Sequence, residues 1–187
     1  MSGIFKADMD NIKRAGTIIN GGGLVAFPTE TVYGLGASVY DRHAVAAIFE
    51  AKGRPAFNPL ISHISIPEML GEYAAADSRA EYLAKKFWPG PLTFVLPRVE
   101  DDPSIDLVCA GLNTITVRCP DHPVARALIN VAGVPIAAPS ANRSQTISPT
   151  TAEAVFESLG ERVDMILDGG PCEVGVESTI LDLTTPK

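Results

Sequence analysis

The chain has 187 residues, of which 46% are hydrophobic and 20% are charged. This length and composition suit a folded protein with a buried core, and we expect a single domain over residues 1–187. The formal net charge of −7 argues against a protein that coats nucleic acid, although a local basic pocket is still compatible with it.

Membrane spans and export signals are not expected from the sequence. No apolar run approaches the roughly 20 residues needed to cross a bilayer, and the first residues lack the apolar stretch of a signal peptide. Cys109, Cys119 and Cys172 have no metal-binding spacing, so we expect reduced and mostly buried thiols. We therefore predict a cytoplasmic protein that does not contact a membrane.

Helices and short strands alternate along the first half of the chain. Residues 8–20 carry apolar side chains at helical spacing, and the glycines at 21–23 favour a helix end. Asp41 is expected to cap a helix that runs to about Ala51 and ends at Gly53. The other elements predicted here are strands over 24–27 and 60–64 and helices over 67–74 and 78–87.

The second half of the chain continues this alternation. Thr150 and Glu153 have capping-box spacing and predict a helix that runs to about Leu159. The other predicted elements are a helix over 123–131 and strands over 92–96, 114–118, 135–138, 165–167 and 179–183. Strands between helices indicate an α/β fold, and the lack of a helix between 92–96 and 114–118 predicts a mixed sheet.

Polar segments follow two of the early elements. The segment 28–36, PTETVYGLG, carries hydroxyl groups and an acid after a buried strand, where ligand sites of α/β sheets often lie; a structural turn explains it equally well. Lys52 and Arg54 flank one glycine, and either face solvent or converge on an anion such as phosphate. His63 lies on the following strand, but no second ligand stands at metal spacing, so no metal site is expected.

Two later segments are also candidates for ligand binding. In the strand 114–118, side-chain alternation places Thr114, Thr116 and Arg118 on one face. A guanidinium there suits a carboxylate ligand, but it could equally form a salt bridge with one of the chain's 22 acidic residues. Residues 139–144 and 148–150 form a polar segment that ends at the start of a predicted helix, where it would serve phosphate binding, helix capping or both. Glycine-rich nucleotide motifs and a nucleophile elbow are absent from the sequence.

Taken in order, seven groups of residues resemble the YrdC-type threonylcarbamoyl-AMP synthase family. They are PTETVYGLG at 28–36, KGRP at 52–55 with NPL at 58–60, WPGPLT at 88–93, TVRCP at 116–120, APSAN at 138–142, SPT at 148–150 and GVEST at 175–179. The family signature of Lys-x-Arg and a later Ser-x-Asn is matched by Lys52, Arg54, Ser140 and Asn142. Each motif alone is weak, but the shared order is highly specific and extends from about residue 15 to 184.

This resemblance implies a twisted, open, mixed parallel and antiparallel sheet with flanking helices around a concave, locally basic cavity. It implies a nucleotidyltransferase that joins L-threonine, bicarbonate or CO2, and ATP into threonylcarbamoyl-AMP and releases pyrophosphate, with Mg²⁺ accompanying ATP. A threonylcarbamoyl transferase complex would be the partner that modifies an adenosine in tRNA. Direct contact between this chain and tRNA is expected to be weak.

The resemblance also implies roles for individual residues. The threonine side would consist of Thr31, His63, Arg118, Ala138 and Ser178. The nucleotide side would consist of Arg54, Asn58, Thr114, Ser140, Asn142 and Ser148. Lys52 and Arg54 would be catalytic, because their charges and that of Mg²⁺ would stabilise negative charge on the phosphate oxygens. No general base is identified, so much of the catalysis is expected to come from positioning the substrates.

The sequence departs from the family pattern in places, and other functions compete with the synthase. Gln145 stands where many relatives have glycine, Ser62 replaces a usual apolar residue, and relatives usually continue beyond Lys187 with a short basic segment. The main alternative is a protein that binds double-stranded RNA or tRNA, or acts in ribosome maturation, through the same cavity. A third is a carbamoyl-transfer module like that of hydrogenase-maturation proteins.

Overall fold

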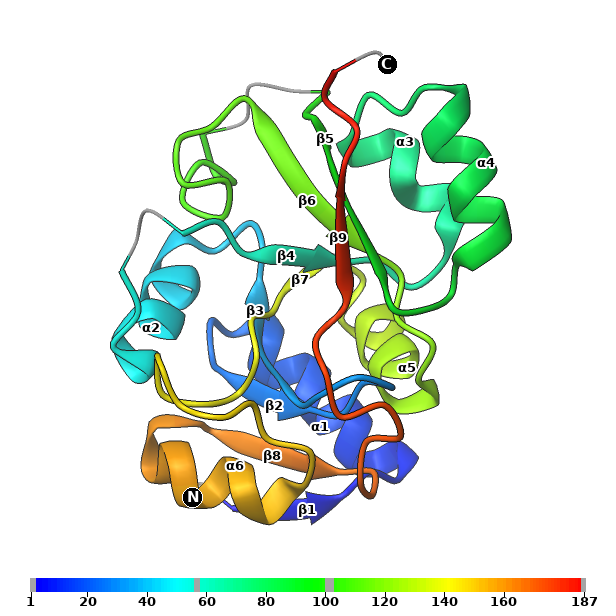
Figure 1. Cartoon of the computed structure of the whole chain (residues 1–187). Coiled ribbons are helices and arrows are strands. Elements are labelled where there is room, and N and C mark those ends of the chain that lie inside the picture. The colour runs from blue at the N-terminus through cyan, green and yellow to red at the C-terminus, as the bar shows by residue number, and fades with distance from the viewer. Residues whose placement is uncertain (1–2, 56–57, 100–102, 186–187) are drawn as a thin grey trace.

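The computed structural model describes residues 3–55, 58–99 and 103–185. Strands of the described residues form one sheet in the order β1-β8-β2-β3-β7-β4-β6-β5-β9 (Figure 1). Their bounds are β1 Ile4–Lys6, β2 Val25–Phe27, β3 Gly34–Ser38, β4 Ile61–His63, β5 Leu92–Pro97, β6 Thr114–Arg118, β7 Ile136–Ala137, β8 Met165–Asp168 and β9 Thr179–Asp182. In Figure 1, β5, β6 and β9 lie steeply in the view while β2 and β8 lie across it, so the sheet is strongly twisted.

The sheet is mixed, as the sequence predicted. Parallel pairing joins β8 to both β1 and β2, β4 to β6, and β5 to β9. Antiparallel pairing joins β2 to β3, β7 to both β3 and β4, and β5 to β6. The neighbouring strands β5 and β6 are antiparallel, and the described residues between them contain no helix that could carry the chain back for a parallel crossover.

Six helices of the described residues flank this sheet. Their bounds are α1 Met9–Asn20, α2 Arg42–Lys52, α3 Leu70–Tyr73, α4 Ser78–Phe87, α5 Pro123–Ala132 and α6 Ala152–Leu159. Helices α1 and α5 pack against each other behind the central strands, and Ile12, Ile19 and Leu128 bury their side chains there (Figure 1). A second core forms between the remaining helices and the sheet, with Ile48 of α2 and Phe94 of β5 fully buried. Removing this apolar surface from water is the main source of stability.

Several local predictions are confirmed by the structure. The side chain of Asp41 accepts hydrogen bonds from the backbone N–H groups of His43 and Ala44 and caps α2. Gly53 ends that helix at φ 60°, a left-handed conformation that glycine adopts without a steric penalty. Because Lys52 is the last residue of α2, this cap also fixes the point at which the chain turns toward Arg54.

Other local predictions were wrong. The cap of α6 is Thr151, whose hydroxyl accepts from the N–H of Ala154, and not Thr150. By contrast, the predicted helical stretch over 67–74 is present, as a 3-10 turn, Pro67–Met69, followed directly by the short α3. Strands β1 and β3 were not predicted, and β3 occupies part of the segment interpreted as a polar turn.

Two expectations about the chain's chemistry can be compared with the structure. All three cysteines are free thiols, with Cys109 and Cys119 buried and Cys172 half-buried, as expected. Within residues 3–55, 58–99 and 103–185, none of the helices combines the length and apolar character needed to cross a bilayer.

Candidate active site

A cavity of about 340 Å³ opens between the middle of the sheet and the segment that leads into β9. Its size falls within the roughly 300–1,000 Å³ typical of small-molecule sites. Its walls come from residues 29, 31, 32, 34, 54, 58–61, 63, 138–140, 177, 178 and 180, together with side chains of β5 and β6. Segments far apart in the sequence therefore meet at one concave site.

Arg118 is the central cation of this cavity and is also part of an ion pair. Its Nη2 donates to Oε1 of Glu30 over 2.6 Å, and both side chains are buried. Its Nη1 donates to Oγ1 of Thr31 over 3.0 Å and its Nε to the carbonyl of Gly90 over 3.3 Å. A guanidinium has five N–H groups, so these contacts fix its orientation and leave donors for a ligand. The salt bridge that the sequence allowed for Arg118 is confirmed, and its role as a ligand for a carboxylate stays a prediction.

His63 faces the cavity as a neutral imidazole. Burial, followed by the nearby charge of Arg118, lowers the pKa of His63 to about 3. Its Nδ1 lies 3.2 Å from the carbonyl oxygen of Ile61, which only accepts, so Nδ1 carries the proton. The edge of the ring packs against Phe27, with 6.3 Å between centroids. His63 therefore adds shape and polarity to the site without adding charge.

The remaining residues predicted on the threonine side also line the cavity. Thr31 is fully buried, and its hydroxyl lies 2.9 Å from that of Thr29. The hydroxyl of Ser178 lies 2.7 Å from that of Thr93 on β5. Ala138 is held by a hydrogen bond from its N–H to the carbonyl of Ile61. The structure thus brings Thr31, His63, Arg118, Ala138 and Ser178 together.

The predicted nucleotide side is brought together only in part. Arg54, Asn58 and Ser140 line the cavity. Arg54 donates from Nη2 to the carbonyl of Pro59 over 3.4 Å, whereas its buried Nε has no hydrogen-bond partner among the described residues. Burial lowers the pKa of Arg54 from its usual value, opposed by the charge of Glu177. An incompletely satisfied guanidinium is a suitable donor for an anion.

Thr114, Asn142 and Ser148 do not belong to the cavity wall. Thr114 begins β6, and at about 3.3 Å per residue it lies roughly 13 Å from Arg118 along the strand. The amide of Asn142 donates to the carbonyls of Arg143 and Thr146. The hydroxyl of Ser148 donates to Oε1 of Glu177 over 2.9 Å, and Glu177 does line the cavity.

Lys52 is buried behind the cavity and not in its wall. Its Nζ donates to the carbonyls of Ser140 and Asn142 and, over 3.4 Å, to Oδ1 of Asn142. The carbonyl of Lys52 accepts from the N–H of Ser144. Burial, then the charge of Arg54, lowers the pKa of Lys52 to about 8. In this arrangement Lys52 holds the loop that carries Ser140.

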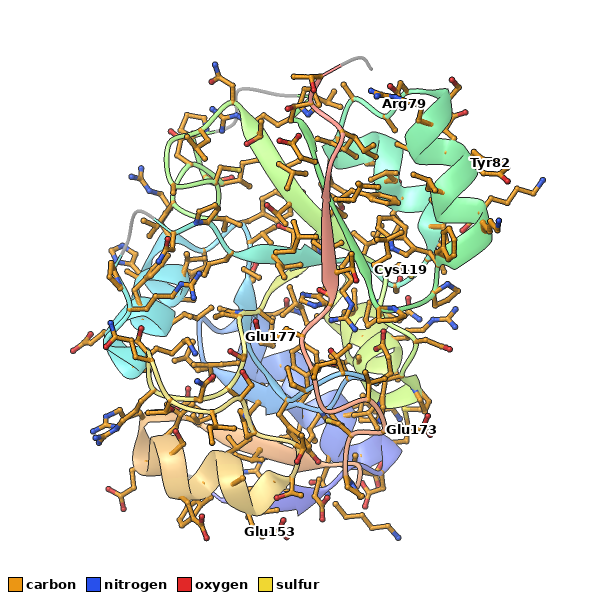
Figure 2. All side chains as sticks on the ribbon, viewed as in Figure 1. Arg79, Tyr82, Cys119, Glu153, Glu173 and Glu177 are labelled. Carbon is orange, nitrogen blue, oxygen red and sulfur yellow. The ribbon has the colours of Figure 1, made fainter. Side chains whose placement is uncertain are left out.

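Two acidic residues of the site were not singled out from sequence. Glu30 is paired with Arg118, and Glu177 lines the cavity and accepts a hydrogen bond from Ser148. Both stand in motifs that resemble the family, next to residues that were predicted to bind a ligand. That neighbourhood is the sequence feature from which these two acids could have been predicted. Figure 2 shows Glu177 near the middle of the view on the segment that leads into β9, with Glu173 lower on the same segment.

Comparison with known proteins places the chain in a wider group. Residues 17–187 match the family model of Sua5, YciO and YrdC proteins, described as telomere recombination. The threonylcarbamoyl-AMP synthase of Pyrococcus abyssi is 53% identical over 174 residues, which are 92% of this chain and 51% of the relative. A putative threonylcarbamoyl-AMP synthase of Mycobacterium tuberculosis H37Rv is 41% identical, with 90% of this chain and 78% of the relative covered.

Solved structures give a consistent result. The structure of P. abyssi Sua5 complexed with L-threonine matches with a TM-score of 0.91 and 50% identity, over 98% of this chain and 54% of that one. E. coli YciO matches with a TM-score of 0.87 and 27% identity, over 99% and 92%. This chain therefore spans about half the length of the P. abyssi protein and most of YciO.

Proposed function

The chain belongs to the Sua5/YciO/YrdC family, and from this we propose that it forms threonylcarbamoyl-AMP and pyrophosphate from L-threonine, bicarbonate or CO2, and ATP. The observation that carries the proposal is a single cavity with an oriented cation at each side, Arg118 near Thr31 and Arg54 near Ser140. Relatives of about half identity that bear the name of this activity support it.

On the threonine side, Arg118 binds the substrate carboxylate with the N–H groups that Glu30, Thr31 and Gly90 leave available. Ser178, Ala138 and the neutral His63 surround the rest of the amino acid. The amine of threonine, in its neutral form, attacks CO2 and loses a proton to give a carbamate. A carbamate oxygen then attacks the α-phosphorus of ATP, and pyrophosphate leaves.

On the nucleotide side, Arg54 contacts the phosphates, and Asn58 and Ser140 bind the nucleotide from the cavity wall. Lys52, Asn142 and Ser148 act from behind, because they hold the loop that carries Ser140 and the carboxylate of Glu177. Thr114 contributes only to a nucleotide that extends along β6 beyond the cavity. Catalysis comes mostly from positioning and from charge stabilisation of the phosphates.

Mg²⁺ would enter this site as a companion of ATP. Within the described ranges, no three His, Cys, Asp or Glu side chains gather in a way that could hold a metal ion. The cavity wall nevertheless presents one carboxylate, that of Glu177, near Arg54. When bound with ATP, Mg²⁺ neutralises phosphate charge. Arg54 and Glu177 are the residues that would face it.

The product requires a further protein, because threonylcarbamoyl-AMP must pass its acyl group to tRNA. We propose that a threonylcarbamoyl transferase complex in the cytoplasm accepts it and modifies an adenosine in tRNA. The net charge of −7 supports a minor role for tRNA contacts with this chain itself.

Pyrophosphate release from the purified chain tests the activity. We expect release only when ATP, threonine and bicarbonate are all present, together with an adenylate labelled by radioactive bicarbonate. Equal release from ATP alone, or from ATP and threonine under CO2-free conditions, would contradict the proposal.

A further inference from the structure

Glu177 occupies a position at which a carboxylate is unexpected. Of the described residues that line the cavity, it is the one with an acidic side chain. It lies on the nucleotide side, where its charge opposes the lowering of the pKa values of both Lys52 and Arg54. A carboxylate close to these cations repels the phosphates of a bound nucleotide unless another cation lies between them.

The position of Glu177 is fixed by its surroundings. Just before it in the chain, the N–H groups of Val174 and Gly175 donate to the carbonyls of Glu30 and Thr31. Just after it, Thr179 begins β9 and pairs with β5. The hydroxyl of Ser148 holds Oε1 of Glu177 over 2.9 Å. The backbone around Glu177 is therefore anchored on both sides, and its exposed side chain is joined to Ser148 by one hydrogen bond.

The charges around the cavity nearly cancel. Arg118 is paired with Glu30, and Arg54 and Glu177, of opposite charge, both line the cavity. Lys52 adds one positive charge, but its amino group is directed to the carbonyls of Ser140 and Asn142. Such a site does not provide the surplus of positive charge that a free triphosphate, with three to four negative charges, requires. It suits a nucleotide whose charge has already been reduced by a divalent cation.

We propose that Glu177 is the protein's contact to the divalent cation carried by ATP, so that the cavity selects the metal–nucleotide complex over the free nucleotide. This inference rests on the proposed function, because it assumes that ATP binds beside Arg54. Mg²⁺ commonly binds through one or two carboxylates together with substrate phosphates and waters. Ser148 then orients the carboxylate toward the metal in the way that outer hydrogen bonds orient metal ligands.

Calorimetric titration of a non-hydrolysable ATP analogue, with excess Mg²⁺ or with EDTA, tests this selection in the absence of catalysis. We expect the wild-type chain to bind the magnesium complex at least about tenfold more tightly than the free analogue. Glu177→Gln should bring the two affinities within about threefold, through weaker binding of the complex and unchanged or tighter binding of the free form. Glu173→Gln, a matched change on the same segment outside the cavity wall, should behave as wild type.

A second readout uses Mn²⁺ in place of Mg²⁺. The electron paramagnetic resonance spectrum of Mn²⁺ with the analogue should change on adding wild-type chain and should revert toward that of the free complex with Glu177→Gln. If Glu177→Gln keeps the preference for the metal complex, or if the wild-type chain shows no such preference, this inference is wrong while the proposed function stands. Tighter binding of both forms by Glu177→Gln overturns it in favour of a simple counter-ion to Arg54. A wild-type chain that binds neither form overturns the proposed function as well.

Discussion

At the scale of single residues, the Glu30–Arg118 ion pair contributes both to the stability of the fold and to the proposed binding of threonine. Both side chains are buried, and Oε2 of Glu30 has no hydrogen-bond partner among the described residues. Taking two charges out of water is costly, so each charge is tolerated mainly because the other is present. The pair also sets the direction in which Arg118 presents its remaining donors.

Removing one member of this pair should therefore destabilise the fold. We expect Arg118→Met and Glu30→Gln each to lower the free energy of unfolding by about 3 kcal/mol, because one buried charge is left alone. The double variant should recover much of this loss, since neither charge remains. Urea unfolding of the wild type, the two single variants and the double variant measures the coupling energy. If the loss in the double variant equals the sum of the losses in the single variants, the two charges are not coupled.

Threonine binding by the same variants should follow a different order. Arg118→Met and the double variant should both lose threonine affinity by about ten- to a hundredfold, the effect of one charge-assisted hydrogen bond of about 1.5–3 kcal/mol. Arg54→Ala, on the nucleotide side, is the control and should leave threonine affinity unchanged while weakening ATP binding. Calorimetric titration of threonine distinguishes these cases, and intact affinity in Arg118→Met would make Arg118 purely structural.

Lys52 should make nucleotide binding sensitive to pH. Because burial lowers its pKa to about 8, Lys52 is protonated below this value and neutral above it. Its contacts with the loop of Ser140 and Asn142 weaken when the charge is lost, so ATP affinity should decline as the pH rises through 8. Lys52→Arg remains charged and should shift this decline to higher pH. The same decline in both proteins, measured by titration from pH 7 to 9.5, would assign it to another group.

Among the secondary-structure elements, helix boundaries and caps were the most predictable features. Asp41 and Gly53 bracket α2 as expected, because their side chain and backbone preferences act over a few neighbouring residues. At the start of α6, Thr150 and Thr151 each have a hydroxyl group that could cap the helix. The capping-box spacing of Thr150 to Glu153 led to the prediction of Thr150, whereas the cap is Thr151. Local sequence preferences therefore predicted the helix correctly but could not show which of the two adjacent threonines caps it.

A pair of substitutions checks the cap of α6. Thr151→Ala should lower the free energy of unfolding by about 1 kcal/mol, since the N–H of Ala154 loses its acceptor. Thr150→Ala is the matched control and should cost less, because the contact it makes to Cys172 uses its backbone carbonyl. If urea unfolding shows that both variants lose the same free energy of unfolding, Thr150 and Thr151 contribute equally to the cap.

Strand β3 shows why part of the sheet could not be predicted. Its residues, GLGAS, lack the β-branched side chains that favour strands, and glycine is usually depleted there. At Gly36 a Cβ atom would lie 2.7 Å from both Ile136 Cγ2 and Phe27 Cε1, so only glycine allows the approach. One of these two contacts is with Ile136, which lies 100 positions further along the chain. At the site, the sequence likewise pointed to the cations but not to Glu30, the acid that pairs with Arg118 across 88 positions of the chain.

At the scale of the whole molecule, the charge balance bears on tRNA. A chain of net charge −7 with a nearly neutral cavity offers few phosphate contacts, so bare tRNA should bind weakly. Few contacts release few counter-ions, so affinity should depend only slightly on salt, and ATP should compete for Arg54. Anisotropy titrations of tRNA at several salt concentrations, with and without ATP, test this. Submicromolar binding with a steep salt dependence and no effect of ATP would favour the RNA-binding alternative.

The route of the segment that leads into β9 has a consequence for how the protein is made. This segment supplies Glu177 and Ser178 to the cavity and attaches by its backbone to Glu30 and Thr31, which are synthesised about 145 residues earlier. In a nascent chain on the ribosome, Arg54 and Arg118 are therefore synthesised well before the segment that completes the wall of the cavity. Threonine and ATP should begin to protect such a chain from protease only after residues 177–182 have emerged from the exit tunnel.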